Sequence, residues 1–109
     1  MISKRREREN RRSPRVEVSK GIWVAWRTDG SPSVSRVRDL SAGGVFISTS
    51  SPLSTGSSVQ LLFSLPEGEV RVEGIVRYSS SGAGMGVEFV RMGTADRARL
   101  QELIRRLNS

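Results

Sequence analysis

Short runs of strand-forming residues alternate with turn residues along most of the chain, and this alternation narrows the possible folds. Six strands are expected: 16–18 continued by 22–26 beyond a bend at Gly21, then 34–40, 44–49, 59–65, 70–78 and 85–90. Short antiparallel strands at this spacing build sandwiches or barrels. Closure into a barrel also removes the exposed edges that an open sheet would leave. The sequence therefore predicts an all-β fold with a six-stranded antiparallel β-barrel.

The last stretch has a different period and predicts one α-helix. Its apolar residues recur at helical spacing, at Leu100, Leu103, Ile104 and Leu107. We expect a C-terminal helix over 94–107, with Thr94 as its N-cap and its apolar face packed on one end of the barrel. Asp96 near the start and the arginines near the end suit the helix dipole.

Parity along the strands predicts which side chains face the core. Val70, Val72, Val76 and Tyr78 share one parity of their strand, with Gly74 at a point where a barrel strand can bend sharply. Trp23 and Trp26 have opposite parity, so one is expected in the core and the other more exposed. Four strand arginines are expected on the solvated face, namely Arg36, Arg38, Arg71 and Arg77. Of these, Arg36 or Arg38 can also flank a site at Asp39.

The absence of two residue types excludes several classes of function. The 109 residues include no Cys and no His. That removes disulfides, thiolate nucleophiles, Cys/His zinc sites and histidine-based catalysis. No pair of acids indicates a catalytic dyad, so we expect no enzyme activity, no catalytic residues, no metal and no cofactor. The lack of Cys fits a reducing cytoplasm, so we expect a cytoplasmic protein. We expect neither membrane insertion nor a signal peptide, because no apolar run has the required length or place.

Positive charge is concentrated at the N-terminus of a chain whose formal net charge is +7. We expect residues 1–9 to form a flexible basic arm and residues 10–109 to form one domain that includes the helix. Arginine is commoner than lysine, which favours bidentate contacts to phosphate or base edges. The alternative is that Arg11, Arg12 and Arg15 form a solubilising cluster only.

The turn at 39–44 joins two expected strands and carries a set of polar groups. Asp39 supplies an acceptor and Ser41 a hydroxyl, beside the bare backbone of Gly43 and Gly44. Glycine reaches positive φ without a steric penalty, as tight connections require. The set can hold the hydrogen-bonding edge of a flat ligand. Alternatively, Asp39 and Ser41 only satisfy the amides of the turn.

Two motifs together resemble those of the PilZ family. Arg11 and Arg15 form an Arg-x-x-x-Arg pair, and Asp39, Ser41 and Gly44 form an Asp-x-Ser-x-x-Gly turn. Members of that family are small β-barrel receptors for the bacterial second messenger cyclic di-GMP. The resemblance covers nearly the whole chain, from the arginine segment through the barrel to the terminal helix. It implies a non-catalytic receptor whose ligand is cyclic di-GMP.

The resemblance also implies the residues of a ligand site. They are Arg11, Arg12, Arg15, Asp39, Ser41, Gly43 and Gly44. The arginines would meet guanine edges and phosphate, Asp39 and Ser41 would hold a guanine, and the glycines would shape the turn beneath it. Ordering of the N-terminal segment on binding, with altered contacts to a protein effector, would then carry the signal.

Two other functions stay open at this point. A small basic barrel can bind RNA or single-stranded DNA, but such modules need a row of stacking aromatic residues on a strand face. Aromatic residues are 6% of the chain and form no such row, which disfavours nucleic acid as a partner. The other alternative is a PilZ-like adaptor that binds only protein. That function applies to family members whose motifs have decayed, and it is disfavoured here because both motifs are intact.

Overall fold

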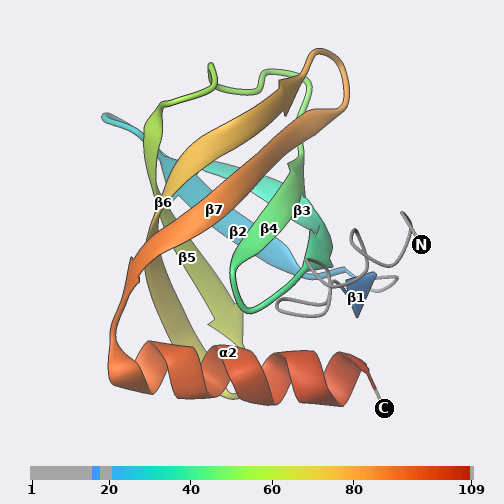
Figure 1. Cartoon of the computed structure of the whole chain (residues 1–109), viewed down its shortest axis with the longest axis vertical. Helices are drawn as coiled ribbons and strands as arrows, with labels where there is room; N and C mark the ends of the chain where they lie inside the picture. The colour runs from blue at the N-terminus through green and yellow to red at the C-terminus, as the bar shows by residue number, and fades with distance from the viewer. Residues whose placement is uncertain (1–15, 18–20, 109) are drawn as a thin grey trace, which may run out of the picture.

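Six of the seven strands close into an antiparallel barrel, as the sequence predicts (Figure 1). The computed structural model describes residues 16–17 and 21–108, so Arg11, Arg12, Arg15 and the arm expected at 1–9 lie outside the described residues. The strands are β1 (Val16–Glu17), β2 (Trp23–Arg27), β3 (Ser33–Leu40), β4 (Gly44–Ser48), β5 (Ser58–Leu65), β6 (Gly68–Ser80) and β7 (Gly84–Met92), followed by the helix α2 (Thr94–Leu107).

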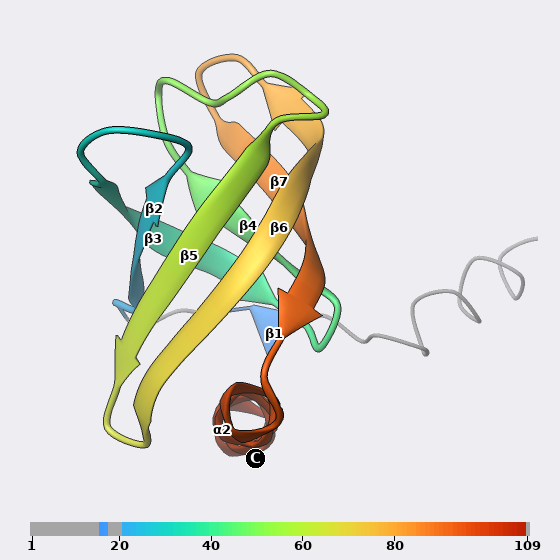
Figure 2. The ribbon, with the colours of Figure 1, turned by 90° about the vertical axis from the view of Figure 1, so that its left-hand side faces the viewer.

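The barrel runs in the order β3-β2-β5-β6-β7-β4, and pairing of β4 with β3 closes it (Figure 2). β1 and β2 pair with the same partner, since Val16 lies opposite Leu40 and Trp23 lies opposite Arg36. The first predicted strand is therefore present in two pieces along β3. The strand expected at 22–26 begins one residue later, although Ile22 still accepts a hydrogen bond from the Val37 amide, 2.8 Å away.

The core lies inside the barrel and is built mainly from aliphatic residues of the strands, joined by Phe63 and by two leucines of the C-terminal helix. Trp26 belongs to it with 7% exposure, whereas Trp23 is 53% exposed on the outer face, which confirms the prediction for this pair. The Trp26 indole Nε1 donates to Ser35 Oγ at 3.0 Å. This hydrogen bond satisfies two polar groups that would otherwise be buried without a partner.

The alternation of inward-facing and outward-facing side chains along β6 is interrupted near its end. Val70, Val72 and Val76 are buried, but Tyr78 is 57% exposed. The pairing register of β6 with β7 shifts between Val76 and Tyr78, and a shift of this kind turns the following side chain to the other face of the sheet. The expectation that Tyr78 follows the valines was therefore wrong. Gly74 does mark an irregularity, because a second shift lies between Glu73 and Gly74.

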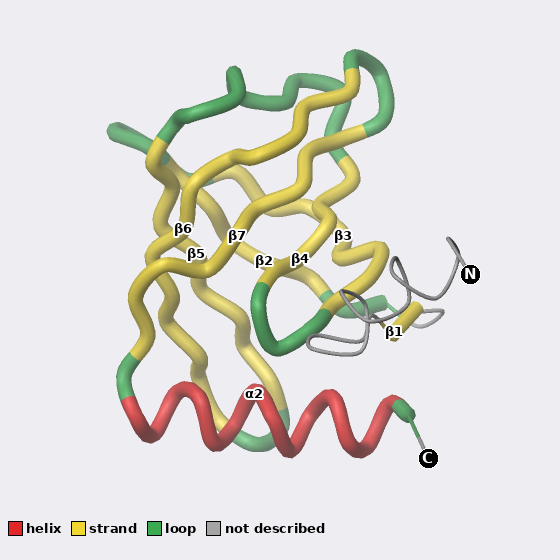
Figure 3. Tube along the Cα trace, viewed as in Figure 1, coloured by secondary structure: helices red, strands yellow, loops and turns green. Residues whose placement is uncertain are grey.

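The helix α2 lies across one end of the barrel, beside the β5–β6 hairpin (Figure 3). Leu100 and Leu103 are buried, and Ile104 and Leu107 pack partly buried against the core, which confirms the predicted apolar face. Thr94 is not the N-cap, because the helix already includes it. The cap is Gly93, which makes no side-chain cap hydrogen bond.

Three polar contacts tie α2 to the β5–β6 hairpin, and we call them the helix clamp. The Arg71 amide donates to Asp96 Oδ1 at 3.0 Å, and Arg99 Nη1 donates to the Glu69 carbonyl at 3.1 Å. Arg106 Nε lies 2.7 Å from Glu67 Oε2. The hydrogen bond from Arg106 holds the pKa of Glu67 below its ordinary value. The helix is thus fixed by charge as well as by its apolar face.

Candidate functional site

Ser41 organises the turn between β3 and β4. Its side chain is buried at 3% exposure. Ser41 Oγ accepts from the amides of Gly43 and Gly44 at 3.2 and 3.1 Å and lies 3.4 Å from the Gly44 carbonyl oxygen. The Ser41 amide also donates to that carbonyl at 2.9 Å. The hydroxyl is therefore engaged with the turn backbone, the structural role that the sequence left open beside ligand contact.

The two glycines of the turn hold β4 close to β7. Gly44 pairs with Glu88, and a Cβ built on Gly44 would lie 2.5 Å from the Val87 carbonyl oxygen. Gly43 accepts a hydrogen bond from the Phe89 amide at 2.9 Å. Gly44 has no positive φ, so it does not adopt the left-handed conformation expected of the turn glycines. A glycine is required there because two backbones approach each other closely.

Asp39 sits at a β-bulge just before the turn. β3 pairs with β4 through Val37 opposite Ile47 and then Asp39 opposite Phe46, so Arg38 is an extra residue in β3. Val37 and Leu40 are both buried, while Arg38 between them is exposed and Asp39 is half-buried. Two consecutive residues are thereby directed away from the core. Bulges redirect side chains in this way and are common beside functional sites.

Phe46 forms a hydrophobic floor on the outer side of this bulge. The ring is only 6% exposed, although it lies outside the core cluster. Arg38 Cζ lies 4.3 Å from the centroid of the Phe46 ring. The ring of Tyr78 packs from another side, with centroids 5.9 Å apart and planes inclined by 51°. Neither Phe46 nor Tyr78 belongs to a motif, so the sequence alone does not indicate either one as a site residue.

β1, which directly follows the arginine segment in the sequence, pairs with the end of β3. Glu17 lies opposite Asp39 and Val16 opposite Leu40. The described strand pairing therefore puts Val16 and Glu17 beside the end of β3 that leads into the turn. The positions of the Arg11, Arg12 and Arg15 side chains lie outside the described residues.

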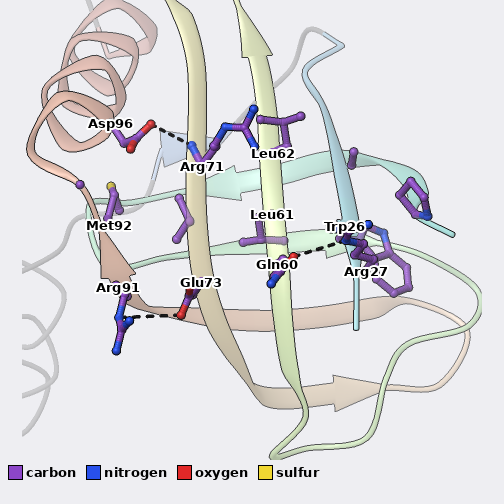
Figure 4. A pocket seen from close by; sticks show the side chains of 14 residues that line it. Trp26, Arg27, Gln60, Leu61, Leu62, Arg71, Glu73, Arg91, Met92 and Asp96 are labelled. Carbon is purple, nitrogen blue, oxygen red and sulfur yellow. Dashed lines mark hydrogen bonds and ion pairs between the residues drawn. The ribbon is translucent and has the colours of Figure 1, made fainter. Parts of the chain in front are cut away.

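An open groove of about 520 Å³ lies on different strands, over β2, β5, β6 and the end of β7 (Figure 4). Leu62 and Met92 contribute apolar surface, and Arg71 and Arg91 lie at its rim. Arg91 is paired with Glu73 at 3.8 Å. No residue of the 39–44 turn lines the groove. Within the described part of the chain, no cluster of three or more acidic residues is arranged to hold a metal ion.

Comparison with known proteins decides the family. The family profile described as PilZ domain matches residues 9–106. The chain belongs to the PilZ domain family. The match includes the arginine segment, the bulge and turn, and α2. No curated protein matches the chain.

Solved structures share this PilZ fold. The Bacillus subtilis inhibitor of motility MotI/DgrA is 27% identical, with a TM-score of 0.67 over 88% of this chain and 52% of that one. A Klebsiella pneumoniae MrkH–c-di-GMP complex is 19% identical, with a TM-score of 0.74 over 89% of this chain and 52% of that one. The Escherichia coli YcgR PilZ domain with c-di-GMP is also 19% identical, with a TM-score of 0.70 over 89% and 90%. This PilZ chain spans about half the length of MotI and MrkH. Among its described residues, no helix has the length and hydropathy to cross a membrane.

Proposed function

We propose that this PilZ protein is a non-catalytic receptor for cyclic di-GMP that acts in the cytoplasm. Family membership over residues 9–106 supports this proposal. So do the MrkH and YcgR structures, whose descriptions name complexes with c-di-GMP. The chain is a binding module in this view, and its output is a change of shape that a protein effector recognises.

The observation that carries the proposal is the register of β1 against β3. Val16 lies opposite Leu40, directly before the turn that contains Ser41, and Arg15 precedes Val16 in the sequence. An arginine fork meets the O6 and N7 acceptors of guanine with two parallel hydrogen bonds, and it also binds phosphate. Asp39 is an acceptor for the N1–H and N2–H donors on the other guanine edge. One ligand containing guanine and phosphate can therefore engage both motifs.

The signal in this proposal is the ordering of the N-terminal segment. Arg11, Arg12 and Arg15 would be held against the turn by the two phosphates and the guanines. Ordering costs roughly 1–2 kcal/mol of conformational entropy per residue, so only a short part of the arm should become ordered. The ordered segment would then alter the surface offered to the effector.

Calorimetric titration tests the proposal. Cyclic di-GMP should bind, while GTP and a short single-stranded oligonucleotide at the same concentration should not. Arg15→Ala should abolish most of the heat. Arg97→Ala is the matched control. Arg97 is exposed on α2, and its substitution likewise removes one positive charge. Absence of binding by the unmodified chain would refute the receptor function, and binding of the oligonucleotide alone would favour the nucleic-acid alternative.

A further inference from the structure

We propose that Arg38 is a ligand-binding residue, which reads a guanine of the messenger together with Asp39. The inference rests on the proposed receptor function and adds a residue that belongs to neither motif. Three features of the described residues lead to it: the bulge that exposes Arg38, the ring that supports it, and the donor pattern that it places beside a carboxylate.

The bulge decides that Arg38 and Asp39 are directed to the same side. In a regular strand the buried residues Ser35 and Val37 would be followed by an inward-facing residue 39. Instead the register shifts between Val37 and Asp39, and the next buried residue is Leu40. Without the bulge, Asp39 would face the core and Arg38 alone would face solvent.

Phe46 supports the Arg38 side chain from below. The guanidinium carbon lies 4.3 Å from the ring centroid. The ring itself is held over β7 at a place where Gly84 leaves room for it. A Cβ on Gly84 would lie 2.8 Å from Phe46 Cε1. A buried floor of this kind reduces the conformational freedom that Arg38 would lose on binding a ligand.

Arg38 also differs from the arginines of the helix clamp and the groove. Arg106 and Arg91 are paired with Glu67 and Glu73. Among the described residues, the contact made by Arg38 is with the Phe46 ring, and no carboxylate pairs with it. Its five N–H donors therefore remain available to a ligand. Burial of the ring alone would not require a guanidinium, since an apolar side chain would cover Phe46 equally well.

The adjacent donor and acceptor match two neighbouring edges of guanine. The Watson–Crick edge carries the N1–H and N2–H donors next to O6, and the Hoogsteen edge carries the O6 and N7 acceptors. With Asp39 accepting from N1–H and N2–H, a neighbouring arginine meets O6 and N7. A forked guanidinium suits two acceptors in one plane, whereas a lysine ammonium acts as a point charge.

The experiment uses the full chain, with calorimetric titration of cyclic di-GMP and thermal unfolding of each variant. Arg38→Met removes the donors but still covers Phe46, and Arg38→Lys keeps the charge without the fork. Arg97→Met is the matched control, because Arg97 is exposed on α2 and its substitution removes the same charge. We expect Arg38→Met to weaken binding about tenfold. Arg38→Lys should recover little of that loss, Arg97→Met should bind like the unmodified chain, and all four melting temperatures should agree within a few degrees.

The outcomes separate this inference from the proposed function. If the unmodified chain does not bind cyclic di-GMP, the receptor function fails and this inference fails with it. If it binds and Arg38→Met binds equally well, the receptor function stands and Arg38 only covers Phe46. If Arg38→Lys restores full affinity, the contact is a charge contact to phosphate, and the reading of guanine by Arg38 is wrong.

Discussion

The motif turn (residues 38–44) and the helix clamp use similar side chains in different ways. In the clamp, Arg106 pairs with Glu67, Arg99 binds the Glu69 carbonyl, and Asp96 accepts from the Arg71 amide. These charges hold one element of the chain against another. In the motif turn, the backbone is already satisfied by Ser41, and Arg38 rests on an aromatic ring. Positive charge alone therefore does not identify a ligand residue; the partner that each charge has within the fold distinguishes the two roles.

This difference between the motif turn and the helix clamp predicts that mutations in the two regions have separable effects on stability and on ligand affinity. Changes at the clamp or beneath α2 should lower the free energy of unfolding and leave ligand affinity nearly unchanged. Changes at the exposed groups of the motif turn should do the reverse.

Leu103→Ala should destabilise the protein most, because Leu103 is fully buried between α2 and the barrel. Removal of a buried leucine side chain leaves a cavity and costs about 2–5 kcal/mol. Denaturant unfolding measures the loss, with Gln101→Ala on the exposed side of α2 as control. Affinity for cyclic di-GMP below the melting temperature should stay within about twofold. A large loss of affinity in a folded Leu103→Ala protein would show that the helix contributes to the site.

Gly44→Ala should also lower stability, although Gly44 lies in the motif. The new Cβ would lie 2.5 Å from the Val87 carbonyl oxygen, so β4 and β7 would have to separate. Overpacking of this kind costs about 1–3 kcal/mol. Gly86→Ala is a matched control on the paired strand, because its Cβ would lie 3.5 Å from the nearest atoms. Unchanged unfolding of Gly44→Ala with lost affinity would assign the glycine to the ligand rather than to the barrel.

Asp39→Ala should weaken cyclic di-GMP binding by about 1–3 kcal/mol and leave the fold largely intact. The half-buried Asp39 is directed away from the core by the bulge, so its removal opens no core cavity. Calorimetry and circular dichroism measure the two effects, and Asp29→Ala in the exposed turn after β2 controls for the lost negative charge. Loss of folding in Asp39→Ala would show that its carboxylate is structural.

Glu67→Gln should lower the melting temperature by a few degrees at neutral pH, because it removes the charge that pairs with Arg106. The folded pKa of Glu67 is lowered by Arg106. Its stabilising contribution is therefore present above the unfolded pKa of about 4.3 and is lost as the pH falls through the lower folded pKa. The unmodified and Glu67→Gln proteins should thus converge in acid. Glu73→Gln, whose carboxylate pairs at 3.8 Å on the exposed barrel surface, is the control. A difference that persists unchanged below the folded pKa would mean that Glu67 acts through packing instead.

The sequence by itself determined the secondary-structure elements of this protein, and it contains both motifs. Strand positions and the apolar face of α2 follow from patterns within a few neighbouring residues, and the structure contains them. The contrast between Trp23 and Trp26 follows from parity in the same way. The roles of Arg11, Arg12 and Arg15 remain predictions, because these residues lie outside the described part of the chain.

Only the tertiary structure decided which side chains around the motif turn face outward and which of them lie together. The bulge at Arg38, the outward turn of Tyr78 and the contact of Gly44 with Val87 each depend on a partner strand. Those partners are distant in sequence, so no local period encodes them. A bulge bends its strand and increases the local twist, and bulges are common at the rims of barrels. The bulge in β3 places Arg38, Asp39 and Phe46 together, which is why their juxtaposition appears only in the folded protein.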